Sequence, residues 1–309
     1  MQTLEGLKRR IKTTSSLREI VSSMKTLSAV SVGQYEKSTQ ALNQYYNCVE
    51  LALQALLKGR STPAPKKSVL QQRIIAVVLG SDQGLVGKFN KSIAKYTDDY
   101  LKNHKIHRDD ITLIVGGKSL SSKFLSLGWD IDTMFTMPSS IKAMITVAKK
   151  IVIKLNDLTI EQQHGDKDFN FNNNNLKVFV FYNAKDEHSI IKPHAFQLLP
   201  IDTNFLARLK ERHWPTKNIP QYNRASRRTL FSFFIRQLLF VEIYKAIASS
   251  LASEHFTRMI SMQNAEKNID EHLESMNLEY QQRRQTEITN ELLDVVVGSE
   301  VLKNKKNKE

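Results

Sequence analysis

Apolar side chains recur at intervals of three and four positions along the first 57 residues. The recurring positions are Leu4, Leu7, Ile11, Leu17, Val21, Met24 and Leu27. No proline interrupts this segment, and the spacing places the apolar residues on one face of a helix. The pattern predicts one long amphipathic helix over residues 1–58, ended by the breaker-rich stretch GRSTPAP.

The pattern changes between about residues 70 and 200, where short apolar runs alternate with amphipathic stretches of helical length. The runs are RIIAVVLG, ITLIVGG, DIDTMF, LKVFVFYN and SIIKPHAFQLLP, and the helical stretches cover 88–104, 119–127 and 140–158. This order predicts a small doubly wound α/β domain over residues 70–200, closed by one antiparallel pair of strands. The Asn-rich tract of residues 165–175 lacks periodicity and is predicted to be a surface loop.

Proline and glycine are absent from residues 223–297, a length equivalent to roughly 110 Å of helix. The second half of this segment has the alternating three-four spacing of a coiled-coil seam. The predicted seam positions are Met262, Ala265, Ile269, Leu273, Met276, Tyr280, Ile288, Leu292 and Val295. Gly298 is predicted to end the helix, which leaves residues 299–309 as a basic tail.

The two ends of the chain carry its long amphipathic helices, so the economical arrangement pairs them. We predict an α+α/β fold: a long antiparallel coiled coil of the N-terminal helix and the 223–298 helix, with the small doubly wound α/β domain inserted between them. The run LFSFFIRQLLFVEIYKAIASSLA is apolar on nearly every side and is predicted to be buried. The part after Ser253 has one apolar stripe and many charges, and it is predicted to project.

The charge balance requires acidic partners. Lys and Arg number 45 against 31 acidic residues, which gives a net charge of +14, so nucleic acid, anionic lipid and protein carboxylates all qualify. The single cysteine, Cys48, excludes an internal disulfide and a multi-cysteine metal site. The N-terminus does not have the pattern of a secretory signal, and no run approaches the roughly 18 apolar residues of a membrane span, so any membrane contact is expected to be peripheral.

Two glycine-containing turns follow strands and open helices, which is the position of a phosphate-binding loop. They are Gly80–Lys88 and Gly116–Ser119. The second has Thr112 where the pattern requires its leading glycine, and the first has Phe89 where a magnesium-binding hydroxyl is required. The histidines lack metal-ligand spacing, and no nucleophile elbow is present. The sequence therefore predicts no catalytic residue, no cofactor and no metal site.

Three strings carry a resemblance to a known family. SLASEHFTRMISMQNAEKN and RRQTEITNELLDVVVGSEVL near the C-terminal end, and GSDQGLVGKFN after the first strand, resemble the gamma subunit of F-type ATP synthases. The last string departs from the family's pattern at Gln83, Val86 and Lys88. The resemblance covers nearly the whole chain.

The N-terminal helix points to a subtype of that family. SSMKTLSAVSVGQYEKS departs from the usual family stretch, although Met24, Lys25 and Ala29 keep its register. MQTLEGLKRRI and SVGQYEKSTQALNQYY look closer to the alternate, N-type bacterial ATPases. This subtype implies a peripheral position on the cytoplasmic face of a bacterial inner membrane, in a complex that pumps protons or sodium ions.

The resemblance implies a mechanical function in ion transport and ATP synthesis or hydrolysis, without catalysis by this chain. The coiled coil is expected to stand inside a ring of three alpha and three beta subunits, as the central shaft of the rotary motor. The globular base is expected to bind the epsilon subunit and the ring of membrane c subunits.

The family's partner contacts carry over to named positions. The contact with the catch loop of the beta subunit matches Arg284, Gln285, Thr289 and Glu291, with Met24 and Lys25 at the opposing N-terminal position. Cations on the N-terminal helix are expected to face acidic lever loops of the beta subunits. They are Lys25 again and Lys8, Arg9, Arg10, Lys12 and Arg18.

Two other functions fit parts of the sequence. A basic coiled-coil protein could bind nucleic acid along its rod, but after Ser253 the C-terminal helix carries more acidic than basic residues. An enzyme could use the α/β domain, but that domain lacks a phosphate loop and a catalytic cluster. We therefore expect neither nucleic-acid binding nor catalysis.

Overall fold

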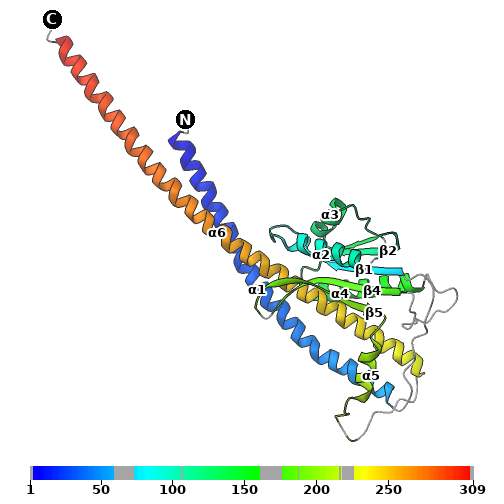
Figure 1. Cartoon of the computed structure of the whole chain (residues 1–309). Coiled ribbons are helices and arrows are strands. Elements are labelled where there is room, and N and C mark those ends of the chain that lie inside the picture. Colours follow the sequence, from blue (N-terminus) through cyan, green and yellow to red (C-terminus); the bar gives the residue numbers. More distant parts are fainter. Residues whose placement is uncertain are drawn as a thin grey trace. The chain divides into compact units, whose positions relative to one another are not determined.

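The computed structural model describes residues 3–58, 73–104, 106, 108–160, 176–186, 188–215, 217 and 226–306 (Figure 1). The chain divides into two compact units. The terminal unit combines residues 1–27 with 259–309, and the sheet unit is residues 28–258. Each of the two long helices contributes to both units. The Asn-rich tract of the predicted surface loop lies outside the described residues.

The sheet unit contains a mixed five-stranded sheet in the order β3-β2-β1-β4-β5. β1 pairs parallel with both β2 and β4, β2 pairs parallel with β3, and β5 pairs antiparallel with β4. The single antiparallel pair was predicted from the sequence, whereas the order of the strands was not. The strands are β1 Arg73–Leu79, β2 Ile111–Gly116, β3 Thr133–Phe135, β4 Leu176–Lys185 and β5 Ile191–Leu199.

Helices cover both faces of this sheet, which confirms the doubly wound arrangement. Alternate residues of β1 enter two different cores, because successive side chains of a strand point to opposite faces. Ile74 packs with α2 and α3, whereas Ile75 packs with α4, α1 and α6. The helices are α1 Leu4–Leu57, α2 Phe89–Asn103, α3 Lys118–Ser126, α4 Ile141–Ile160 and α6 Arg227–Lys306.

Two short helices were not predicted from the sequence. They are a 3-10 turn, η1 Arg108–Asp110, and α5 Thr203–Glu211. Asp202 caps α5, since its side chain accepts a hydrogen bond from the backbone N–H of Asn204 at 2.9 Å. Leu206 and Leu209 of α5 are buried.

The apolar first half of α6 is buried in the sheet unit, as predicted. Ile235, Ile243 and Ile247 are fully buried. In this unit α1 and α6 run antiparallel: Tyr45 donates a hydrogen bond to Gln237 at 2.8 Å, and Tyr35 stacks on His255 with ring centroids 5.5 Å apart. The lower-numbered residue of α1 thus meets the higher-numbered residue of α6.

The terminal unit also pairs α1 with α6 antiparallel. Arg18 forms an ion pair with Asp270, and Lys25 forms one with Glu266 at 2.5 Å. The expected antiparallel pairing of the terminal helices is therefore present in each unit.

The predicted end of the C-terminal helix at Gly298 is wrong. α6 continues through this glycine to Lys306, so most of the expected tail is helical. Glycine permits a left-handed stop but does not impose one, and inside a helix it costs only about 1 kcal/mol relative to alanine. No helix among the described residues is long and apolar enough to cross a membrane.

Candidate functional site

The turn after β1 packs directly against the turn after β2. The N–H of Gly80 donates to the carbonyl of Gly116 at 2.8 Å, and the N–H of Ser119 donates to the carbonyl of Ser81 at 3.1 Å. Gly117 has a φ of +112°, and a Cβ on it would lie 2.6 Å from the carbonyl oxygen of Ser81. Glycine is required there because the two backbones approach too closely for a side chain.

Asp82 connects the same two turns through its carboxylate. Oδ1 accepts a hydrogen bond from the N–H of Lys118 at 2.9 Å, and Oδ2 accepts one from the N–H of Met137 at 2.8 Å. Lys118 is the first residue of α3, so a protein carboxylate already occupies the position where this helix end would attract an anion. A phosphate could bind at α3 only by displacing Asp82, which gives the turn a structural role.

Asn90, at the start of α2, completes the junction. Its side-chain oxygen accepts from the N–H of Ser81 at 3.0 Å, and its amide nitrogen donates to the hydroxyls of Ser81 and Ser119 at 2.8 and 3.0 Å. Asn90 is buried, so these bonds replace those it would make with water. The junction therefore fixes α2 and α3 to the same end of the sheet.

A buried ion pair on α6 lies beside this junction. Glu254 and Arg258 are each 6% exposed and pair at 2.7 Å, and the hydroxyl of Ser250 donates to the carbonyl of Leu79 at 3.4 Å. Burial raises the pKa of Glu254 to about 7, Arg258 opposes this rise, and the charge of Asp82 adds to it. Two of the three strings that resemble the gamma family, GSDQGLVGKFN and the first part of SLASEHFTRMISMQNAEKN, thus meet at one place in the sheet unit.

His255 extends the cluster toward α1. Burial, followed by the charge of Arg258, lowers the pKa of His255 to about 4, so the ring is neutral at physiological pH. Its Nδ1 lies 3.3 Å from the guanidinium of Arg258, and its ring stacks on Tyr35. Sequence reasoning assigned no role to Glu254 or Arg258, although their spacing of four residues on a helix is typical of an ion pair.

The predicted contact residues near the C-terminal end of α6 are exposed. The side chains of Arg284, Gln285, Thr289 and Glu291 all face solvent in the terminal unit. The hydroxyl of Thr289 donates to the backbone carbonyl of Gln285 at 2.8 Å, which leaves its oxygen able to accept a further bond.

The structure separates Met24 from these four residues. Lys25 pairs with Glu266, and Arg284 lies 18 positions further along α6, about 27 Å at 1.5 Å per residue. The expectation that Met24 lies opposite Arg284 is therefore wrong. Met24 itself is half-buried.

Two of the expected counter-charges for beta-subunit loops have partners within the chain. Lys25 pairs with Glu266 and Arg18 pairs with Asp270, so both contribute to the pairing of α1 with α6. Lys8, Arg9, Arg10 and Lys12 are exposed on the first turns of α1. These four remain available for a partner.

The predicted coiled-coil seam ends before the sequence pattern does. In an antiparallel helix pair, the residue numbers of two facing positions have a nearly constant sum. The ion pairs Arg18–Asp270 and Lys25–Glu266 give a sum of about 290. Leu4, where α1 begins, therefore lies opposite a position near residue 286. Beyond that point Ile288, Leu292 and Val295 are 46%, 62% and 70% exposed, in contrast to buried Met262. On α1, Leu17 and Leu27 of the predicted amphipathic face are also exposed. For Ile288, Leu292 and Val295 the expected burial in the seam is wrong.

Known proteins are similar to this chain over nearly its whole length. The family model described as "ATP synthase" matches residues 3–302. A curated ATP synthase gamma chain from Anaeromyxobacter sp. is 28% identical, with 98% of this chain and 100% of the relative aligned, and one from Geobacter metallireducens is 26% identical over the same shares. The chain belongs to the ATP synthase gamma family.

Solved structures show the same fold. A chain from the Euglena gracilis mitochondrial ATP synthase, titled OSCP/F1/c-ring, matches 98% of this gamma chain with 95% of its own length, a TM-score of 0.63 and 14% identity. A chain from the central stalk and c-ring of the Tetrahymena thermophila enzyme matches 80% with 99% of its own length, a TM-score of 0.51 and 21% identity. At these identities the likeness is one of fold.

Gamma chains are the rotor subunits of the central stalk and are not catalytic, so membership of the family makes this chain a non-catalytic subunit. The described residues contain no group of three or more His, Cys, Asp or Glu side chains that could hold a metal ion.

Proposed function

We propose that this chain is the central shaft of an F-type ATP synthase or ATPase and couples ion translocation to ATP synthesis or hydrolysis through its rotation. The observation that carries the proposal is the part of α6 beyond about residue 286. There the seam positions Ile288, Leu292 and Val295 have no α1 residue opposite them and are exposed. Clustered exposed apolar side chains mark an interaction surface.

The partners of this surface are the alpha and beta subunits of the catalytic head. Arg284 and Gln285 are exposed just before the surface begins, with Thr289 and Glu291 within it, so polar and apolar contacts are available side by side. An asymmetric shaft presents a different face to each catalytic site as it turns. Each orientation then favours a different conformation of the neighbouring site.

The sheet unit is the part that we assign to the epsilon subunit and the c-subunit ring. The family relationship supports this assignment, as do the rotor and c-ring assemblies in which the structural relatives were solved. Bacterial relatives support a peripheral position at the cytoplasmic face of a bacterial inner membrane. The N-type subtype stays a prediction from the N-terminal strings.

The double substitution Arg284→Ala with Gln285→Ala tests the coupling role. The pair is exposed, so folding should change by less than about 0.5 kcal/mol. We expect ATP-driven ion pumping in reconstituted vesicles to fall relative to ATP hydrolysis, because the contact that transmits torque is weakened.

A matched control on the same helix is Lys267→Ala with Asn268→Ala, also an exposed cation followed by an amide. The control should keep the wild-type ratio of pumping to hydrolysis. An unchanged ratio in the Arg284/Gln285 variant as well would remove these residues from the coupling mechanism.

A further inference from the structure

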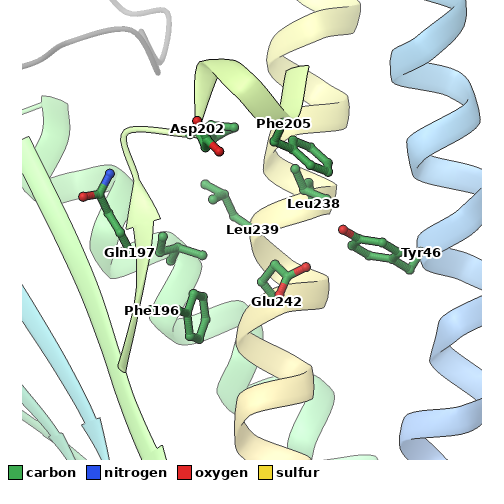
Figure 2. A pocket seen from close by; sticks show the side chains of 10 residues that line it. Tyr46, Phe196, Gln197, Asp202, Phe205, Leu238, Leu239 and Glu242 are labelled. Atoms are coloured by element: carbon green, nitrogen blue, oxygen red, sulfur yellow. The ribbon is translucent and has the colours of Figure 1, made fainter. Parts of the chain in front are cut away.

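A small pocket lies in the sheet unit between α1, α6 and the junction of β5 with α5 (Figure 2). Its volume is about 160 Å³. Apolar side chains form most of its wall, among them Phe196 from β5, Phe205 from α5 and Leu238 and Leu239 from α6. A cavity of about 150 Å³ holds one benzene molecule, so this pocket suits a ligand of about five or six heavy atoms.

Two carboxylates also line this pocket. Glu242 extends from α6 into the space between Tyr46 and Phe196, and Asp202 lies at the start of α5 (Figure 2). Burial raises the pKa of Glu242 above its ordinary value, and the negative charge of Glu50 adds to this rise. The charge of Lys245 and a hydrogen bond from Tyr46 oppose it. The half-buried carboxylate of Glu242 is therefore only partly compensated by its neighbours.

The lining residues of the pocket include no lysine or arginine. The ammonium of Lys245 lies 3.6 Å from the centre of the Tyr46 ring, Arg212 pairs with Glu50 at 3.0 Å, and Arg208 lies 3.9 Å from Asp202. The pocket thus presents apolar walls and negative charge to a ligand, while the positive charge stays outside.

We propose that this pocket binds a small free amine, with the ammonium group against Glu242 and the short apolar chain against the phenylalanine and leucine side chains. An ammonium ion pairs with the carboxylate and forms a charge-assisted hydrogen bond to it. Transfer of the apolar chain from water to the apolar side chains of the pocket is favourable through the hydrophobic effect. This site is separate from the contacts assigned to the shaft and does not depend on them.

The test uses the purified full chain with labelled Ile and Leu methyl groups and n-butylamine as the probe, with n-butanol as its uncharged counterpart. We expect butylamine to shift the methyl resonances of Leu238 and Leu239 saturably and to bind at least tenfold more tightly than butanol. Equal affinity for the two probes would overturn the proposal, because the pocket would then select only for apolar character.

Two variants examine the carboxylates separately. Glu242→Gln keeps the side-chain shape and should weaken butylamine at least tenfold without changing butanol binding. Asp202→Asn keeps a residue suited to the N-cap of α5 and should weaken butylamine by a factor of about two or three. The control Glu274→Gln removes an exposed charge from the same helix and should change neither affinity. Unchanged butylamine affinity in Glu242→Gln would contradict the assigned role.

A third probe, Nα-acetyl-lysine methylamide, distinguishes a free amine from a lysine side chain of another protein. The blocked backbone of this probe is too large for a pocket of this volume, so we expect it to bind at least tenfold more weakly than butylamine. Equal binding of the two would overturn the assignment to a free amine and point to a partner's lysine.

Discussion

The substitution Glu254→Gln should stabilise the chain at alkaline pH. Glu254 lies almost completely buried beside Arg258, and its pKa in the folded chain is about 7, against an ordinary value of 4.5. Since one pKa unit corresponds to 1.36 kcal/mol, ionising this carboxyl in the folded state costs about 3 kcal/mol more than in the unfolded chain. Glutamine has nearly the same shape and never ionises.

The pH window follows from the direction of this shift. Below pH 4.5 the carboxyl is protonated in both states, so the variant and the wild type should have equal free energies of unfolding. Between pH 4.5 and about 7 the unfolded chain releases its proton while the folded chain retains it, which favours unfolding of the wild type. Above pH 7 the variant should be more stable by about 3 kcal/mol.

Urea unfolding of both proteins at pH 4 and pH 8 measures this difference. Glu274→Gln, an exposed change on the same helix, should leave the free energy of unfolding within about 0.5 kcal/mol of wild type at each pH. A Glu254→Gln protein that is less stable than wild type at pH 8 would refute the reasoning, because the ion pair with Arg258 would then outweigh the burial of the charge.

The junction of the two turns gives the remaining predictions. Gly117→Ala combines a φ of +112° with a Cβ contact of 2.6 Å and should cost about 1–3 kcal/mol, whereas Gly84→Ala, with no atom within 4 Å of its Cβ, should cost much less. Asp82→Asn loses one of two acceptors for backbone N–H groups and should cost about 1 kcal/mol. Urea unfolding checks all three, and equal stability of the Gly117 and Gly84 variants would contradict the close approach of the turns.

The sequence predicted the secondary structure of the sheet unit well because its periodicities are strong. The run RIIAVVL has the continuous apolar character of a strand covered on both faces, and it became the central strand β1. Helix α5 was missed because it is short, although Asp202 before it is a typical N-cap and Leu206 and Leu209 are three positions apart.

The sequence predicted the end of the paired region poorly. An apolar stripe on α6 indicates that something covers it, but not which partner does so. Leu292 and Val295 continue the stripe past the start of α1 at Leu4, so no residue of α1 faces them. The pattern that was assigned to pairing within the chain serves contact with another subunit in our proposal.

The sequence identified the segments that form the candidate site, but it did not predict that they contact one another. Resemblance singled out the Gly80–Lys88 turn and the segment around Glu254, but their meeting depends on the packing of α6 against the end of β1. The part of α6 after Ser253 was predicted to project, but the structure buries Glu254 and Arg258 at its start. Opposite charges four residues apart offset part of the cost of burying both, and the raised pKa of Glu254 shows that the offset is incomplete.

The most direct test of the proposed function is observation of rotation. Cys48 is the single cysteine of the sequence and is exposed, so a probe can be attached there before the chain is assembled with its alpha and beta subunits. With the catalytic head immobilised and ATP supplied, the probe should rotate in one direction. A complex that hydrolyses ATP while the probe stays fixed or moves without direction would contradict the account.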